Sequence, residues 1–289
     1  MTNHLIILAG GASSRMKKPS ISQLSEELIH QANSRSKALI LLNDRPMLDY
    51  VLYNAKQAGY QNIYIVIGKE GELFKTFYGE HRTQNQFRGL SISYVYQHIP
   101  DGRIKPLGTA DAVCQSLEQY PVLQKNQFAV CNCDNLYSVK AFETLRKSKH
   151  NNAFINYDRD ALDYSQDRIE RFALTKVDSN NFLQDIIEKP TTSESEKYKD
   201  TDGKYRVSMN IFKFDGIIFF PFLQSCDIHP ERNEKELPSA LLDMIRSFPT
   251  SVLAIPLTEH VPDLTGKDDI PLMNEYLATH PVNLYWPIN

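Results

Sequence analysis

Cysteine is scarce in this sequence and long apolar runs are missing, and each shortage excludes a class of protein. The four cysteines, Cys114, Cys131, Cys133 and Cys226, lack the C-x-x-C spacing that zinc sites use. The N-terminus shows no signal-peptide pattern, so we expect reduced thiols in the cytoplasm. No apolar stretch approaches the roughly 20 residues that a membrane-spanning helix needs. We therefore expect a soluble, cytoplasmic protein with no membrane partner.

A surplus of positive charge is also missing. The chain has 32 Lys and Arg residues against 35 Asp and Glu residues, which gives a net charge of -3. Binding to the phosphate backbone of a nucleic acid normally requires a basic surplus, so we expect no nucleic-acid partner. A chain of 289 residues with 42% hydrophobic content can bury one large core. Any anion-binding site must therefore be local, within an ordinary globular fold.

The first 15 residues combine an apolar run, two glycines and an arginine. Residues 5–8 are Leu, Ile, Ile and Leu, a pattern typical of a strand buried on both faces of a parallel sheet. Gly10 and Gly11 follow, then small residues at 12–14, so backbone N–H groups can approach a ligand closely. Arg15 adds a planar, permanently charged fork that suits a phosphate. The segment predicts a phosphate-binding loop, and the alternative is a plain glycine turn beside exposed basic residues.

Two later segments place polar groups at the ends of predicted strands. Residues 106–110 (PLGTA) should begin a helix with Thr109 at or near its N-cap, so that backbone N–H groups face the strand ends. The strand at 128–131 runs into Asp134. A carboxylate at the carboxyl end of a central strand, beside a phosphate loop, is where Mg²⁺ would be held. The alternative is that Asp134 is solvated and caps the next helix.

The rest of the chain shows alternating strand and helix patterns, which favour strand–helix–strand units and a parallel sheet. Apolar alternation or short apolar runs predict strands at 62–68, 90–96, 153–157, 205–214 and 251–257. Amphipathic spacing predicts helices at 47–58, 70–78, 139–147 and 268–279.

Other segments show less regular patterns. We expect an amphipathic helix over 21–33 with Ser22 as its N-cap. Residues 168–177 and 182–187, separated by a polar turn, predict a β-hairpin. The polar residues 191–204 predict a mobile loop. The hairpin should deliver the tripeptide at 188–190 (EKP) to a strand end.

The C-terminal third carries acidic residues whose roles differ. Glu234 and Glu236 precede a predicted helix, and we assign them only the favourable interaction of negative charge with a helix N-terminus. Thr265 is the expected cap of the last helix. Asp263 precedes it in the segment PDLTGKDD.

Taken in order, these segments resemble the motifs of the nucleotidyltransferase superfamily with the GT-A-like fold, of the sugar-1-phosphate nucleotidyltransferase type. The resemblance covers nearly the whole chain through LAGGASSRM, SKAL, RPML, PLGTADAV, CDN, EKP, VSMNIF and PDLTGKDD. LAGGASSRM and SKAL are also similar to the molybdopterin-nucleotide branch, whereas EKP and PDLTGKDD favour the sugar-phosphate branch.

The sequence departs from the family pattern at three places. Family members have only a few residues between the signature arginine and a lysine, whereas this chain inserts residues 17–36 there. Lys18 or Lys37 could be the counterpart, and we favour Lys37 because NDRPML follows it closely. Cys133 replaces a glycine, and the usual glycine before Thr265 is missing. The role of the insertion stays open.

The resemblance implies an α/β three-layer sandwich with a mixed, mostly parallel central sheet and helices on both faces, of the Rossmann-like nucleotide-diphospho-sugar transferase type. It implies one domain over 1–289, with residues 1–150 as the nucleotide-binding half and residues 151–289 as the sugar-phosphate-binding half.

The resemblance also assigns roles to residues that match family motifs. It implies that Asp134 and Asp263 hold Mg²⁺, and that Arg15, Lys37 and Lys189 are catalytic. The implied nucleotide-binding residues are Leu8, Ala9, Gly10, Gly11, Gln97, Pro106, Gly108 and Thr109. The implied sugar-phosphate-binding residues are Asn135, Glu188, Lys189 and Asn210.

The implied reaction transfers a nucleotidyl group from an NTP to a sugar 1-phosphate or a related small phosphate, with release of pyrophosphate. Two alternatives stay open: a glycosyltransferase of the same fold, and a catalytically silent regulatory protein that binds nucleotide. A pyrophosphate-release assay separates the transferases. The sequence does not choose among UTP, CTP, GTP and dTTP, and it leaves the acceptor and the oligomeric state open, with a homodimer as one option.

Overall fold

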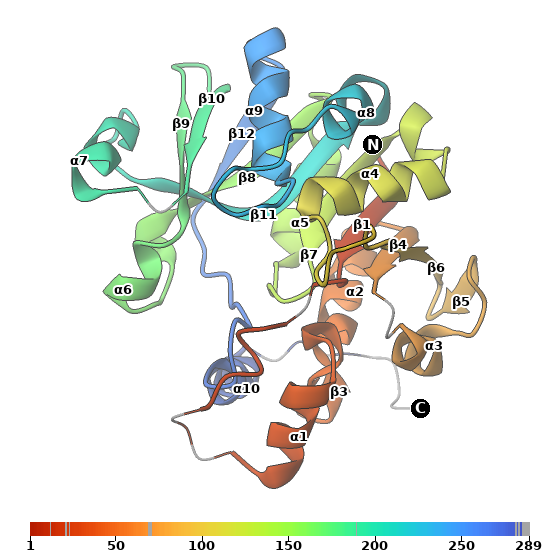
Figure 1. Cartoon of the computed structure of the whole chain (residues 1–289). Helices are drawn as coiled ribbons and strands as arrows, with labels where there is room; N and C mark the ends of the chain where they lie inside the picture. The colour runs from red at the N-terminus through yellow and green to blue at the C-terminus, as the bar shows by residue number, and fades with distance from the viewer. Residues whose placement is uncertain are drawn as a thin grey trace.

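The apolar run near the N-terminus forms β1, the strand around which the central sheet is built (Figure 1). The computed structural model describes the chain except residues 12, 21, 23, 69–70, 189, 281, 283 and 285–289. β1 lies between two parallel neighbours, with Leu5 opposite Ile63 on one side and Ala129 on the other. The strands of this region are β1 (His4–Leu8), β4 (Asn62–Ile67), β5 (Asn85–Phe87), β6 (Leu90–Tyr96) and β7 (Gln127–Asn132).

β11 joins this parallel region to the strands of the second half. It pairs antiparallel with β7 through residues 211–215, and it also pairs with β8 and β9. Its register against β8 shifts between Ser208 and Phe212, and Asn210 in this irregular stretch has φ 57°. The strands of this region are β8 (Asn152–Asp158), β9 (Ala173–Val177), β10 (Leu183–Ile187), β11 (Arg206–Asp215) and β12 (Val252–Leu257).

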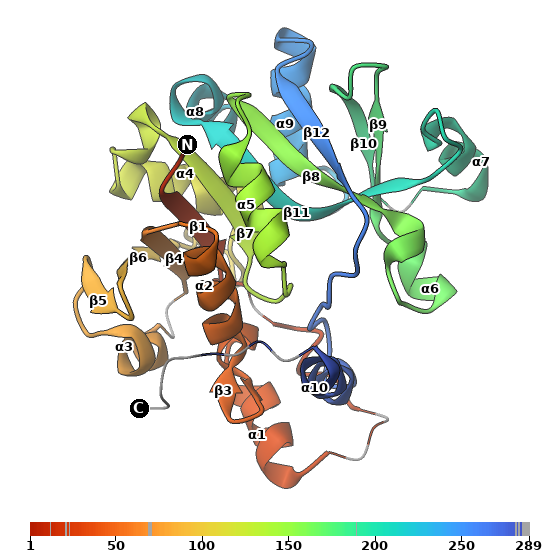
Figure 2. The same cartoon turned by 180° about the vertical axis from the view of Figure 1, so that it is seen from behind.

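Helices cover both faces of the sheet, which confirms the predicted three-layer arrangement with a mixed sheet (Figures 1 and 2). Leu5 and Ile7 pack into the core on one face, with residues of α2 and α5, whereas Ile6 packs into the core on the other face, with residues of α4, α8 and α9. All three side chains are fully buried. The covering helices are α2 (Met47–Gln57), α4 (Thr109–Gln119), α5 (Val139–Lys147), α8 (Gly216–Gln224) and α9 (Leu237–Ser247).

A smaller group of elements lies beyond the carboxyl ends of the parallel strands, at the bottom of Figure 1. It holds the insertion and the last helix, and α10 contacts β2. These elements are α1 (Glu26–Ser34), the 3₁₀ turn η1 (Lys37–Leu39), β2 (Leu41–Leu42), β3 (Arg45–Pro46) and α10 (Asp269–Thr279). The remaining elements are α3 (Glu72–Tyr78), η2 (Leu123–Lys125), η3 (Arg159–Ala161), α6 (Gln166–Ile169), α7 (Thr192–Ser195) and η4 (Glu196–Tyr198).

The start predicted for the insertion helix is wrong. α1 begins at Glu26, and the Ser25 side chain accepts a hydrogen bond from the Leu28 N–H. Ser25 is followed by two glutamates, which the positive end of a helix favours. The backbone N–H of Ser22 instead donates to Asp268 Oδ1 at 2.9 Å.

The predicted hairpin begins later than expected. Residues 173–177 and 183–187 pair antiparallel, as β9 and β10, but Arg168 lies in the short helix α6. The Ser165 carbonyl accepts hydrogen bonds from the N–H groups of Arg168 and Ile169, which makes a helical turn. Arg168 is therefore displaced from the strand to which the pattern assigned it.

Two further local predictions, for residues 191–204 and for the cap of the last helix, are wrong because other residues begin the helices there. Residues 191–204 are not a bare loop, because Thr191 and Glu194 form a reciprocal capping box that starts α7. Asp268, rather than Thr265, occupies the N-cap position of α10. The Thr265 hydroxyl donates to Asp263 Oδ2 at 2.5 Å instead.

Within the described part of the chain, no helix combines the length and the apolar character that crossing a membrane would need.

Candidate active site

A cavity of about 360 Å³ opens at the carboxyl ends of β1 and β7, beside the glycine loop. Most residues predicted for the nucleotide site line it, namely Leu8, Ala9, Gly10, Gly11, Arg15, Lys37, Gln97, Pro106, Gly108, Thr109 and Asp134. Residues to which the sequence assigned no nucleotide-binding role also line it: Ser13, Ser14, Ser36, Val66, Lys105, Ala112, Asn132, Cys133 and Glu234. The carboxyl ends of β1, β4, β6 and β7 therefore meet at one cavity.

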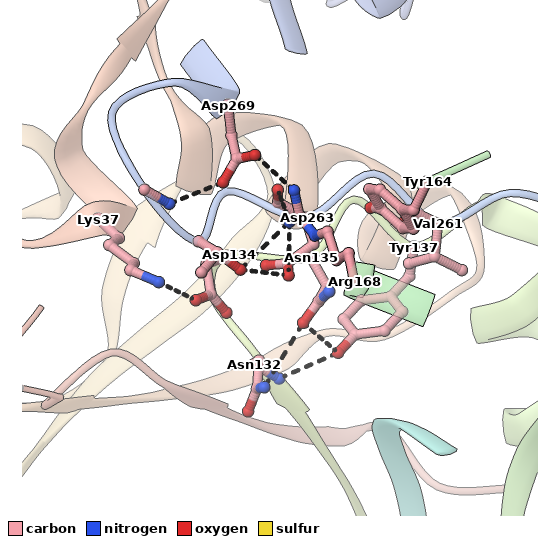
Figure 3. Close-up of polar contacts among 12 residues, drawn as sticks. Lys37, Asn132, Asp134, Asn135, Tyr137, Tyr164, Arg168, Val261, Asp263 and Asp269 are labelled. Carbon is pink, nitrogen blue, oxygen red and sulfur yellow. Dashed lines mark hydrogen bonds and ion pairs between the residues drawn. The ribbon is translucent and has the colours of Figure 1, made fainter. Parts of the chain in front are cut away.

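Asp134 and Asp263 meet next to this cavity (Figure 3). The two segments that carry them are joined by a bridge between Asn135 and Asp263, and the Leu264 N–H donates to the Asp134 carbonyl at 2.8 Å. Burial and the negative charge of Asp134 raise the pKa of Asp263, and its contacts with Thr265 and Arg168 offset that only in part. The structure thus brings together two carboxylates that are 129 positions apart in the sequence.

Each of the two carboxylates has a cationic partner. Lys37 Nζ lies 2.8 Å from Asp134 Oδ2, and Arg168 Nη2 lies 3.0 Å from Asp263 Oδ2. Lys37 is placed by η1, next to Ser36, whose hydroxyl donates to the Ala9 carbonyl at 3.2 Å. Lys18 is exposed and does not line the cavity. This geometry supports Lys37 as the counterpart of the family lysine.

The alternative in which Asp134 caps the following helix is wrong. Ser138 is the N-cap of α5, and its side chain accepts from the Ala141 N–H at 2.9 Å. The Asp134 carboxylate is instead paired with Lys37 at the cavity.

The residues of this site fit a hard divalent cation. Mg²⁺ is usually bound by one or two carboxylates together with substrate phosphates, and Asp134 and Asp263 supply two. The described residues contain no group of three or more His, Cys, Asp or Glu side chains arranged for a metal. The raised pKa of Asp263 has Asp134 among its causes, and a cation between the two carboxylates would relieve their repulsion.

Two glycines of the cavity are closely packed, and glycine is required at one of them, Gly108. A Cβ on Gly10 would lie 3.0 Å from Gln97 Oε1, and Gln97 Nε2 donates to the Gly108 carbonyl at 3.1 Å. Gly108 has φ 126°, and a Cβ there would overlap the Lys235 carbonyl. The resemblance implied that Gly108 binds nucleotide, and the close approach of residue 235 gives a second reason for glycine there.

The assignment of Glu234 and Glu236 to helix-start charge alone is wrong. Glu234 lines the cavity. The Glu236 side chain makes no capping hydrogen bond at the start of α9, and Oε1 pairs with Arg232 Nη1 at 2.6 Å. Arg232 Nη1 also pairs with Glu188 Oε2. Glu188, predicted for the acceptor site, is therefore held by an ion pair.

The other predicted acceptor residues have separate positions. Asn135 is buried, and its Oδ1 lies 3.3 Å from the Tyr137 hydroxyl, which donates to the Met209 carbonyl at 2.7 Å. The Tyr137 hydroxyl also lies 3.2 Å from the Asn210 carbonyl. Tyr137 therefore connects Asn210 to Asn135, the neighbour of Asp134 in the sequence. Asn135, Glu188, Asn210 and Asp263 are not among the described residues that line the cavity. Lys189 lies outside the described residues.

Sequence reasoning missed Arg168, Asn132 and Tyr137. Arg168 was assigned to a strand, although Ser165 followed by Asp167 is a pattern typical of a helix start. Asn132 lines the cavity at the end of β7, one residue before Cys133. Tyr137 gave no signal, because its role depends on contacts with Met209 and Asn210 that are distant in the sequence.

Known proteins similar to this chain include longer proteins whose name describes them as bifunctional. "Bifunctional protein GlmU" of Staphylococcus epidermidis is 24% identical over 278 residues, which cover 95% of this chain and 52% of that protein. The protein of the same name in Staphylococcus haemolyticus is 25% identical over 244 residues, or 83% of this chain and 45% of that protein. The chain spans about half the length of these curated relatives.

Among solved structures, a UDP-glucose pyrophosphorylase complexed with UDP-glucose matches 97% of this chain and 100% of its own, with a TM-score of 0.71 and 12% identity. This likeness shows a shared fold. A sequence profile of the family described as Nucleotidyl transferase matches residues 4–247, from β1 to the end of α9. Because this match covers most of the chain and includes the glycine loop and Asp134, the chain belongs to the nucleotidyl transferase family.

Proposed function

We propose that this protein transfers a nucleotidyl group from an NTP to a sugar 1-phosphate, or to a related small phosphate, and releases pyrophosphate. The observation that carries the proposal is that the bridge between Asn135 and Asp263 brings Asp263 close to Asp134, beside the glycine-loop cavity. The name GlmU on the relatives and the pyrophosphorylase fold support a sugar phosphate as the acceptor.

The nucleotide half of this proposal uses residues 1–150. Gly10 and Gly11 allow the backbone to approach the triphosphate, and Arg15 and Lys37 balance the negative charge of the departing pyrophosphate. Leu8, Ala9, Gln97, Pro106, Gly108 and Thr109 surround the nucleoside. Lys37 is paired with Asp134 in this structure. Binding of the triphosphate would draw the Lys37 ammonium toward the phosphates.

Asp134 and Asp263 would hold Mg²⁺ at the α-phosphate. When bound, the metal would neutralise charge on the phosphate that is attacked and orient it. The protein needs no nucleophilic side chain, because positioning and charge neutralisation supply most of the catalysis in phosphoryl transfer.

The acceptor half would comprise residues 151–289, with Asn135 contributed from the end of β7. Lys189 would hold the attacking phosphate as a mobile point charge, and Glu188 and Asn210 would contact the sugar. Arg232 holds Glu188 at a fixed position.

The test is pyrophosphate release from UTP, CTP, GTP or dTTP with Mg²⁺ and a panel of sugar 1-phosphates. Release that requires both substrates supports the proposal, and the NTP that works best identifies the base. Transfer from a nucleotide sugar without pyrophosphate release would favour a glycosyltransferase. Tight nucleotide binding with no release for any pair would favour a silent regulatory protein.

Asp134→Ala is the decisive variant in that assay. We expect a fall in kcat on the order of 10²-fold or more, because an electrostatic stabiliser of the reacting phosphate is lost. Asp178→Ala is the matched control, since Asp178 lies in the β9–β10 turn and only bonds its neighbours. Turnover near that of the wild type in Asp134→Ala would remove this residue from the site.

We propose a cytoplasmic location, where NTPs are available. The four cysteines are all free thiols in the structure, which suits a reducing compartment.

A further inference from the structure

Arg168 lies between the candidate metal carboxylate Asp263 and the start of α10 (Figure 3). Its Nη2 donates to Asp263 Oδ2 at 3.0 Å and to the Asp263 carbonyl at 2.9 Å. Its Nη1 donates to Asp269 Oδ1 at 2.5 Å. Thr265 Oγ1 lies 3.2 Å from Nη2. One guanidinium therefore contacts both ends of the loop 263–269.

The surroundings of Arg168 fix its orientation. Its Cζ lies 4.3 Å from the centroid of the Tyr164 ring, and the Tyr164 hydroxyl donates to the Val261 carbonyl at 2.6 Å. The Arg168 side chain is 22% exposed. Burial tends to lower the pKa of Arg168, but the carboxylates of Asp263 and Asp269 outweigh it and raise that pKa. The guanidinium is therefore charged and held on several sides.

Arg168 comes from a different part of the chain than the residues it holds. It belongs to α6, between β8 and β9, whereas Asp263 follows β12. Its neighbours Asp167, Glu170 and Arg171, with Pro190, line an open cavity of about 500 Å³. Pro190 is next in sequence to Lys189, the residue proposed for the acceptor phosphate. Arg168 thus connects α6, which lies beside this cavity, to Asp263.

We propose that Arg168 is a positioning residue that holds Asp263 in the orientation in which Asp263 and Asp134 can share a metal ion. The inference rests on the proposed function. Without the guanidinium, the Thr265 hydroxyl would be the remaining side-chain donor to Asp263 among the described residues, and repulsion by Asp134 would turn the carboxylate away. Lysine would be a poor substitute, because a single ammonium lacks the planar fork that reaches Asp263 and Asp269 together.

The first measurement is Mn²⁺ binding to the nucleotide-free protein, followed by electron paramagnetic resonance. Mn²⁺ is the probe because it takes the same oxygen ligands as Mg²⁺. We expect Arg168→Met to bind Mn²⁺ about 10- to 100-fold more weakly than the wild type, the usual cost of removing a residue that orients a metal ligand. The Mg²⁺ concentration for half-maximal pyrophosphate release should rise by a similar factor, while kcat at saturating Mg²⁺ changes less.

Arg206→Met is the matched control. Arg206 Nε pairs with Asp200 at 2.7 Å, both side chains are 12% exposed, and neither contacts the two metal carboxylates. We expect this variant to bind Mn²⁺ as the wild type does. Equal loss in both variants would mean that Arg168 acts only through general stability, and would overturn the inference.

The outcomes separate this inference from the proposed function. Unchanged Mn²⁺ affinity in Arg168→Met, with pyrophosphate release retained, overturns the role of Arg168 alone. A wild type that binds no Mn²⁺ and releases no pyrophosphate overturns the metal site itself. If Arg168→Met does not fold, Arg168→Lys keeps the charge and most of the volume. Full Mn²⁺ affinity in Arg168→Lys would overturn the requirement for a planar fork.

Discussion

At the scale of single residues, Gly108 is a position where both backbone conformation and packing constrain the sequence. Its φ of 126° is a conformation that side chains with a Cβ rarely adopt, and the Lys235 backbone occupies the place of a Cβ. The Ala110 N–H donates to the Lys235 carbonyl at 2.9 Å, and the Lys235 N–H donates to the Leu107 carbonyl at 2.6 Å. The start of α4 is therefore bound to the segment that leads into α9.

We expect Gly108→Ala to lower the free energy of unfolding by about 1–3 kcal/mol, because the chain must adopt a strained φ or move away from residue 235. Denaturant unfolding measures the change. Gly11→Ala is the control, since a Cβ there would meet no atom within 4 Å. Equal effects of the two substitutions would contradict the packing argument.

Glu259 gives a residue-scale prediction on pH. Burial raises the pKa of Glu259 above its ordinary value of 4.5, and the Ser138 hydroxyl, which donates to it at 2.6 Å, offsets this only in part. The folded state therefore binds more protons than the unfolded state between these two pKa values. The contribution of Glu259 to stability is fully present below pH 4.5 and is lost as the pH rises through the pKa of Glu259 in the folded state.

Glu259→Gln keeps an oxygen that can accept from Ser138 and removes the charge. We expect this variant to have a higher Tm than the wild type near pH 7, and a similar Tm near pH 4. Thermal unfolding across that range measures both. Glu143→Gln, at an exposed carboxylate of α5, should leave the profile unchanged. A wild-type advantage at neutral pH would contradict the assigned direction.

Residues that act through local geometry were the ones that the sequence could predict. Gly10, Gly11 and Asp134 lie directly after buried strands, and the ends of neighbouring parallel strands must meet at one edge. Arg168 and Tyr137 could not be predicted, because their contacts depend on how distant segments pack. The catalytic and binding roles themselves stay predictions.

At the scale of elements, the insertion is held to the last helix by a buried lysine. Lys267 is 6% exposed, and its Nζ donates to the Lys18 carbonyl at 3.0 Å and to Asn33 Oδ1 at 2.7 Å. Asp268 Oδ1 accepts from the Ser20 hydroxyl at 2.6 Å. These contacts join both ends of the insertion to the loop that contains Asp263.

We expect Lys267→Met to loosen the insertion while leaving the central sheet intact. Loss of the ammonium leaves two acceptors without this donor, at a cost of about 1–3 kcal/mol. Hydrogen exchange should become faster in α1 and at the start of α10, with β1 and β4 unchanged. Lys199→Met serves as the control, because it removes an exposed lysine that pairs with Glu196. Unchanged exchange in α1 would contradict this attachment.

Elements with strong local signals were predicted closely. α5 has the predicted bounds, and α2 ends at Gln57, one residue before the predicted end, with Gly59 following at φ 94°. α1 was misplaced because more than one serine precedes it, and α6 was missed because the strand pattern was extended back to Arg168. Ser25 caps α1 through its side chain, whereas the N–H of Ser22 bonds to Asp268.

At the scale of the whole molecule, the order of motifs predicted the fold because the fold is built from consecutive strand–helix–strand units in its first half. The second half was less predictable. β11 pairs with β7, β8 and β9 at once, and its register shifts near Asn210, so alternation in the sequence reveals a strand but not its partners.

The sharing of β11 carries the last prediction, which concerns cooperativity. Phe212 is fully buried, and it lies opposite Val130 of β7 and Phe154 of β8. Because one residue supports strands of both halves, we expect the halves to unfold in one transition. Phe212→Ala should cost about 3–5 kcal/mol and lower hydrogen-exchange protection of β1 and β12 equally. Phe248→Ala, at a side chain 54% exposed, should leave both nearly unchanged. Loss of protection in β12 with full protection in β1 would show that the halves unfold separately.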